Sequence, residues 1–128
     1  MIGLDPTVAR FPIVLVVDPV AASRFMMWRL LNGSFGVLEA EDALRAHQWL
    51  DRRQSIAAIV VQRELPDAHG GEFVESLVSA HVAAASRAII VGRPIDFRAV
   101  VTSLAGWFLV REVRKASALL REASRLVA

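Results

Sequence analysis

Short apolar runs alternate along this chain with longer segments in which apolar residues recur at the spacing of a helix. The runs have the length of buried strands, and each segment between them is long enough for a helix that crosses to the next strand. Strands connected by helical crossovers run parallel, and a parallel sheet is covered on both faces. The alternation therefore predicts an α/β fold of three layers, with a parallel sheet between two layers of helices. The predicted strands include or end at residues 11–18, 39–40, 59–62, 88–92 and 107–110.

Helices are predicted at residues 20–31, 43–51, 71–84, 97–104 and 112–127. The first carries an apolar stripe that is expected to face the sheet, made of Met26, Met27, Leu30 and Leu31. Gly33 is expected to end this helix, because glycine readily adopts the left-handed conformation of a helix stop. Asp96 is expected to cap the helix at 97–104 by accepting backbone N–H groups. The basic residues on the outer face of the last helix are typical of solvated surface, so no nucleic-acid partner is predicted.

Length and composition limit the number of domains and the kinds of chemistry and partner that this chain can have. A chain of 128 residues fits one domain, predicted at residues 11–128 after a short tail at residues 1–10. The chain has no cysteine, which excludes a disulfide framework and thiolate chemistry. No apolar run approaches the roughly 20 residues of a membrane-spanning helix, so a soluble, cytoplasmic protein without a membrane partner is predicted. The formal net charge of +2 is too small to require a polyanionic partner.

One strand-like run, followed by a proline turn and a glycine, carries the most specific pattern in the chain. The sequence IVVQRELPDAHG at residues 59–70 resembles the third strand and following loop of response-regulator receiver domains, where the strand leads into a phosphoacceptor aspartate. Residues 11–18 are similar to the first receiver strand, Arg24 fits the first helix, and residues 39–50 match the second strand end and helix, with Ala43 in place of the usual glycine. The resemblance implies a flavodoxin-like (βα)5 fold, with five strands in the order 2-1-3-4-5, and a role in two-component or phosphorelay signalling.

The same resemblance indicates a degenerate phosphorylation pocket. Receivers place two adjacent acidic residues after the first strand, the acceptor aspartate after the third, a Thr or Ser after the fourth and a Lys after the fifth. This chain keeps Asp18, follows it with Pro19, and has Gln62 at the acceptor position and Gly92 at the hydroxyl position. Alignment from the glycine at 106 puts Val110 at the lysine position.

A slip of one residue would offer Arg111 for the lysine, although such a slip reverses the faces of a strand. An amide cannot hold an acyl phosphate, and one carboxylate is too few for a hard divalent cation. The sequence therefore predicts a pseudo-receiver with no catalytic activity, no cofactor and no metal. Two alternatives stay open: a regulatory domain that binds a small ligand in the vacated acidic pocket, and a phosphotransfer partner with a displaced acceptor at Glu64 or Asp67. His47, His69 and His81 have no companion cysteine and do not indicate a metal site.

Aromatic residues on the first predicted helix suggest an interaction surface. Phe25 and Trp28 share a face beside the buried stripe, where they either fold over the edge of the core or remain exposed as a docking surface. Trp107 is a third candidate for burial against another molecule. The expected partners are proteins: a signalling kinase, an output domain, or a second copy of this chain in a homodimer.

Overall fold

A four-stranded parallel sheet forms the centre of the part of the chain that the computed structural model describes, residues 11–53 and 55–108. The strands are β1 (Ile13–Val17), β2 (Gly36–Ala40), β3 (Ile56–Gln62) and β4 (Ala88–Val91), in the order β2-β1-β3-β4. The register pairs Val17 with Ala40 and with Val61, and it pairs Gln62 with Val91. All four strands are parallel, so their carboxyl ends meet at one end of the sheet.

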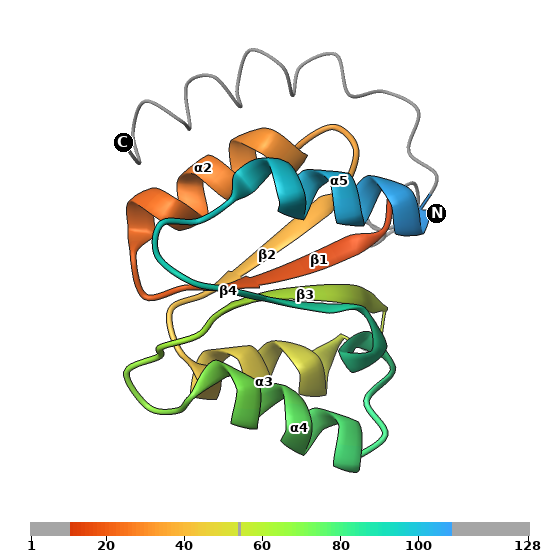
Figure 1. Cartoon of the computed structure of the whole chain (residues 1–128). Helices are drawn as coiled ribbons and strands as arrows, with labels where there is room; N and C mark the ends of the chain where they lie inside the picture. Colours follow the sequence, from red (N-terminus) through yellow and green to blue (C-terminus); the bar gives the residue numbers. More distant parts are fainter. Residues whose placement is uncertain (1–10, 54, 109–128) are drawn as a thin grey trace.

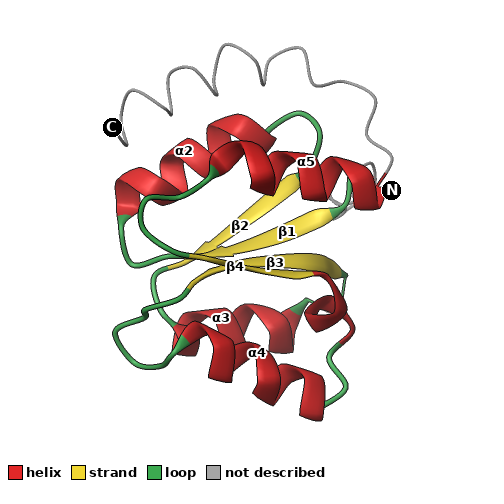
Figure 2. Cartoon of the chain, viewed as in Figure 1, coloured by secondary structure: helices red, strands yellow, loops and turns green. Residues whose placement is uncertain are grey.

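Helices cover both faces of the sheet (Figure 1). The helices α2 (Ala21–Leu31) and α5 (Phe97–Phe108) lie on one face, and α3 (Ala43–Arg52) and α4 (Gly70–Ser79) lie on the other (Figure 2). A short 3-10 helix, η1 (Ala83–Arg87), leads into β4. This arrangement confirms the predicted α/β class with its three layers. No helix in the described ranges is long and apolar enough to cross a membrane.

Successive strand residues divide between two apolar cores, as expected for a sheet buried on both faces. Val14, Val16 and Val60 pack with α2 and α5, whereas Leu15 and Ile59 pack with α3 and α4. The predicted stripe of α2 is confirmed, because each of its four residues is buried: Met26, Met27, Leu30 and Leu31.

The predicted ends of the helices are confirmed at two positions and differ at a third. Gly33 has a φ of +97°, the left-handed conformation expected after the first helix. Asp96 Oδ1 accepts the N–H of Ala99 at 3.0 Å, so Asp96 caps α5. The helix predicted at residues 71–84 ends at Ser79 instead, and His81 beyond it has a φ of 58°.

The prediction of a fifth strand at residues 107–110 is wrong for Trp107 and Phe108, which form the end of α5. The apolar spacing of α5 continues through them, and Phe108 contacts Phe35 edge to face, with ring centroids 5.8 Å apart. Gly106 was expected to precede a strand, but a glycine within a helix costs only about 1 kcal/mol relative to alanine, and this packing outweighs it. Residues 109–110, the predicted last helix and the predicted N-terminal tail lie outside the described residues.

Candidate functional site

Two polar side chains are buried at the carboxyl end of the sheet. Asp18 follows β1 and Gln62 ends β3, and each residue is 3% exposed. They are the buried polar or charged residues of the described ranges. Gly92 follows β4 beside them, because Gln62 pairs with Val91. The structure thus brings together three of the predicted pocket positions, while Val110 and Arg111 lie outside the described residues.

The buried carboxylate of Asp18 is paired with a guanidinium. Its Oδ1 accepts the N–H of Val20 at 2.8 Å and a short hydrogen bond from Nη2 of Arg93. The other terminal nitrogen of Arg93, Nη1, donates to Oγ of Ser23 at 2.7 Å. Arg24 Nη1 donates to the backbone carbonyl of Asp18 at 2.7 Å. A cation of the protein itself therefore neutralises the buried carboxylate of Asp18.

The sequence did not lead us to Arg93. The resemblance places a cation at the end of the last strand, and counting five strands put that position at Val110 or Arg111. In the structure the last described strand is β4, and Arg93 follows it after Gly92. The available signal was an arginine and a proline directly after a strand-like run. The peptide bond between Arg93 and Pro94 is cis.

Gln62 fills the predicted acceptor position with an amide. Its Oε1 accepts the N–H of Arg63 at 3.0 Å, and its Nε2 is a buried donor with no hydrogen-bond partner among the described residues. The chain also passes very close to this position, because a side chain at Gly70 would collide with the backbone oxygen of Gln62. Gly70 N–H donates to the carbonyl of Arg63 at 2.7 Å, which fixes this close approach.

Gly92 has a guanidinium over it in place of a hydroxyl. A Cβ atom at Gly92 would lie 3.6 Å from Nη1 of Arg63, so the end of the Arg63 side chain lies against the glycine. Arg63 is exposed, and its N–H donates to the carbonyl of Val91 at 2.8 Å. Pro19, at the position of the missing second acid, is exposed and offers no carboxylate.

The two loop carboxylates considered as displaced phosphoryl acceptors, Glu64 and Asp67, contact neither Asp18 nor Gln62 in the hydrogen bonds and ion pairs of the described residues. The side chain of Glu64 is 81% exposed and lies 3.9 Å from Nε2 of His69. Asp67 accepts the N–H groups of Ala43 and Leu44, at 2.9 and 3.0 Å, and so caps the start of α3. The hydrogen bond from Ala43 lowers the pKa of the Asp67 carboxyl below its ordinary value, and the bond from Leu44 acts in the same direction.

Capping by Asp67 ties the loop after β3 to a helix more than twenty residues earlier, as the sequence separations of 24 and 23 show. Glu64 is thus exposed beside His69, and both carboxylate oxygens of Asp67 bind the start of α3. Within residues 11–53 and 55–108, no group of three or more His, Cys, Asp or Glu residues could hold a metal ion.

Phe25, Trp28 and Trp107 are all exposed. Phe25 is 56% exposed, Trp28 39% and Trp107 40%. The rings of Phe25 and Trp28 stack on each other, with centroids 6.1 Å apart and planes inclined by 17°. Arg29 adds a guanidinium 6.0 Å from the centroid of Phe25. The aromatic pair is thus an ordered apolar feature on the outer side of α2, and it is not folded over the edge of the core.

Comparison of the sequence with family models and with characterised proteins finds no match. The structure is similar to several solved receiver domains. One is the signal receiver domain of a putative Luxo repressor protein from Vibrio parahaemolyticus, with a TM-score of 0.63 and 15% identity over 89% of this chain and 93% of that chain. Another is a response regulator receiver protein from Pseudomonas putida, with a TM-score of 0.58 and 21% identity over 88% and 97%.

A third is the signal receiver domain of an HD domain-containing protein from Pseudomonas fluorescens, with a TM-score of 0.62 and 17% identity over 76% of this chain and 94% of that chain. At these identities the likeness concerns the fold. The chain has the fold of receiver domains, with four parallel strands in its described part.

Proposed function

We propose that this chain is a pseudo-receiver of two-component or phosphorelay signalling, which acts by binding another protein and carries no phosphoryl group. The observation that carries the proposal is the pairing of buried Asp18 with Arg93, next to an amide at the acceptor position. The fold shared with receiver domains supports the signalling role.

Phosphoryl transfer to a receiver requires an oxygen nucleophile and a divalent cation that neutralises the developing charge. The amide of Gln62 supplies no such nucleophile. A hard cation such as Mg²⁺ prefers several oxygen ligands, and here Asp18 already binds a guanidinium whose positive charge would repel the metal. We therefore propose no enzymatic activity, no cofactor and no metal for this site.

The two alternatives from the sequence find less support. A ligand in the acidic pocket itself would need open space, but Asp18 and Gln62 are each 3% exposed. A displaced acceptor would need a carboxylate near the pocket, but Glu64 is in the exposed loop and both oxygens of Asp67 bind the start of α3.

Incubation with acetyl phosphate and Mg²⁺, followed by intact mass, tests the loss of phosphorylation. We expect no phosphoryl adduct and no Mg²⁺-dependent binding of beryllium fluoride, whereas a receiver with an intact pocket, run beside it, gives both. Gln62→Asp alone is not expected to restore phosphorylation, because Pro19 supplies no second carboxylate and Arg93 still binds Asp18. A stable adduct on the unmodified chain would contradict the proposal.

The stacked pair of Phe25 and Trp28 is the surface that we propose for the protein partner, with Trp107 as a further exposed aromatic side chain. The partner is a signalling kinase, an output domain or a second copy of the chain, in the cytoplasm, with no nucleic acid or membrane involved. Burying an apolar side chain of this size contributes roughly 1.5–3 kcal/mol. The double change Phe25→Ser and Trp28→Ser is therefore expected to weaken association by about two to four orders of magnitude.

Sedimentation measures association, and circular dichroism checks that the double variant still folds. Leu44→Ser is a matched control, because Leu44 is 63% exposed on α3, on the opposite face of the sheet. Equal association of the double variant and the unmodified chain would rule out the Phe25 and Trp28 face as the interface.

A further inference from the structure

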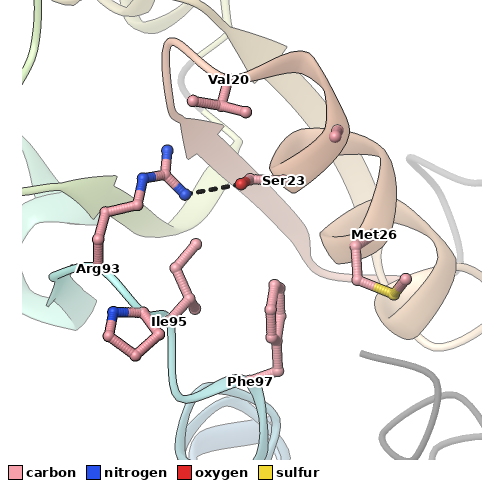
Figure 3. A pocket seen from close by; sticks show the side chains of 8 residues that line it. Val20, Ser23, Met26, Arg93, Ile95 and Phe97 are labelled. Atoms are coloured by element: carbon pink, nitrogen blue, oxygen red, sulfur yellow. Dashed lines mark hydrogen bonds between the residues drawn. The ribbon is translucent and has the colours of Figure 1, made fainter. Parts of the chain in front are cut away.

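A cavity of about 610 Å³ lies between the start of α2 and the turn that joins β4 to α5 (Figure 3). Its walls are mainly apolar, and Val20, Met26, Ile95 and Phe97 contribute to them. Its polar groups are the guanidinium of Arg93 and the hydroxyl of Ser23, which point toward each other. Sites for small molecules are typically cavities of roughly 300–1,000 Å³ with apolar walls and a few polar groups that fix orientation.

We propose that this cavity binds a small carboxylate with an apolar body, which is oriented by Arg93. This site is next to the pocket of Asp18 and Gln62 but separate from it, and the proposal does not depend on the signalling function. Neither Asp18 nor Gln62 lines the cavity.

Arg93 has the capacity to bind an anion in the cavity. A guanidinium carries five N–H donors, and the hydrogen bonds of this side chain in the described part of the structure go to Ser23 and Asp18. The side chain is 42% exposed, so its remaining donors can be reached. The planar guanidinium matches the geometry of a carboxylate.

The start of α2 adds positive potential beside Arg93. The N-cap residue of this helix, Val20, makes no side-chain cap, and the first turn has no acidic residue. Asp18 Oδ1 accepts the N–H of Val20 and offsets part of the helix dipole, and no acidic residue of the first turn offsets the rest. The other helix that begins at the cavity, α5, differs, because Asp96 caps it.

The charge and the walls together define the ligand class. Arg93 and Asp18 together carry no net charge, so the site offers the unused donors of one guanidinium to a monoanion and lacks the positive charge that a highly charged phosphate would need. The apolar walls contribute binding only if the ligand has an apolar body, so acetate should not suffice. A carboxylate attached to an aromatic or aliphatic group satisfies both conditions.

Titration of the ¹⁵N-labelled chain with phenylacetate, octanoate and the corresponding neutral amides tests the proposal by NMR. We expect saturable shifts of the backbone amides of residues 20–24 and 93–97 with at least one of the carboxylates. Its amide is expected to bind at least tenfold more weakly, and acetate and inorganic phosphate should not saturate these shifts. No saturable shift with either carboxylate at millimolar concentration would overturn the proposal, and so would equal binding of acid and amide.

Two variants in the first turn of α2 form a matched pair. Ala21 and Ala22 are both exposed, but only Ala22 lines the cavity. Ala22→Phe should fill the cavity and weaken binding of the carboxylate at least tenfold, whereas Ala21→Phe should leave it unchanged. If the two changes alter the affinity for the carboxylate equally, the proposed binding site is wrong.

Arg93→Gln tests the role of the guanidinium, and it should abolish the preference for the acid over the amide. A retained preference in a folded Arg93→Gln variant would overturn the role of Arg93. This variant also leaves Asp18 without its cation, so its fold is checked by circular dichroism. If Arg93→Gln does not fold, Ala21→Phe and Ala22→Phe still test where the carboxylate binds. The comparison of acid with amide still tests whether the ligand must carry a negative charge.

Discussion

Replacing Arg93 with methionine tests whether its ion pair with Asp18 stabilises the domain. Methionine keeps an apolar stem and removes the guanidinium, so the Asp18 carboxylate retains the N–H of Val20 but loses its cation. Removing one partner of a fully buried ion pair costs about 3–5 kcal/mol. The side chain of Asp18 is 4% exposed but that of Arg93 is 42% exposed, so solvent screens part of the interaction. We expect Arg93→Met to lower the free energy of unfolding by about 2 kcal/mol.

A thermodynamic cycle separates the pair from other effects of the change. Its four members are the unmodified chain, Arg93→Met, Asp18→Asn and the double variant. Asparagine keeps the shape of Asp18 and an oxygen that can accept the N–H of Val20. If the pair is stabilising, the double variant loses less than the sum of the two single losses, by about 1–2 kcal/mol. Urea denaturation at neutral pH, followed by tryptophan fluorescence, gives the four free energies.

Arg98→Met is the control, because Arg98 is an exposed arginine on α5. Its effect is expected to stay within about 0.5 kcal/mol, as for an ordinary surface position. If Arg93→Met has an equally small effect, or if the two single changes are additive, the ion pair contributes no net stability and the stabilising role that we infer for it is refuted.

Three further substitutions test the loop after β3, the start of α4 and the end of α5. Asp67→Ala should lower the free energy of unfolding by about 1 kcal/mol, because α3 loses a cap. The N–H of Ala43 lowers the folded-state pKa of Asp67 below its ordinary value of 3.8. The stabilisation by Asp67 is therefore fully present above pH 3.8 and is lost as the pH falls through the lower folded-state pKa. In urea denaturation, the difference between the unmodified chain and Asp67→Ala should disappear over that pH range. Gly70→Ala should destabilise the fold by about 1–3 kcal/mol, because the added methyl group collides with the backbone carbonyl of Gln62. Gly106→Ala should stabilise the fold by up to about 1 kcal/mol in the same assay, because Gly106 lies in open space on α5. If Gly70→Ala leaves the free energy of unfolding unchanged, the backbone at Gly70 can move away from the carbonyl of Gln62 without cost.

The layers and the core were predictable because they follow from periodicity alone. A buried strand, a helix with one apolar stripe and parallel connections are each set by local spacing, and together they bring the residues after β1, β3 and β4 to one end of the sheet. The resemblance to receiver domains supplied the strand order and singled out Asp18, Gln62 and Gly92 among the residues that follow the strands. These positions could therefore be identified without coordinates.

The end of α5 was not predictable in this way. A short apolar run such as residues 107–110 fits a strand or a helix equally well, and only its packing decides between them. The structure places α5 on the face that α2 occupies, opposite α3 and α4 (Figure 2). The order β2-β1-β3-β4 of the described strands matches the first four places of the order 2-1-3-4-5 that the resemblance implied, and the chain after Phe108 lies outside the described residues.

Arg93 was missed because the pairing depends on tertiary structure over 75 residues of separation. A long flexible side chain in a turn can point in many directions, and the sequence does not state which. Burial of Asp18 supplies the missing constraint, because an unpaired buried carboxylate is strongly unfavourable. Searching for the cation that each buried acid requires would have identified the arginine after β4.

In the pseudo-receiver that we propose, the pairing with Arg93 also explains why a single substitution would not create phosphorylation. With an amide at position 62 and proline at position 19, Asp18 is a single buried carboxylate, and one guanidinium neutralises it. Gln62→Asp would add a second negative charge next in register to Asp18, and the two carboxylates would then share one guanidinium in place of a metal ion. Mg²⁺ could compete only after Arg93 was removed and another oxygen ligand was supplied at Pro19. We therefore expect the ion pair to stabilise this domain and, in the proposed pseudo-receiver, to oppose the metal binding on which phosphorylation depends.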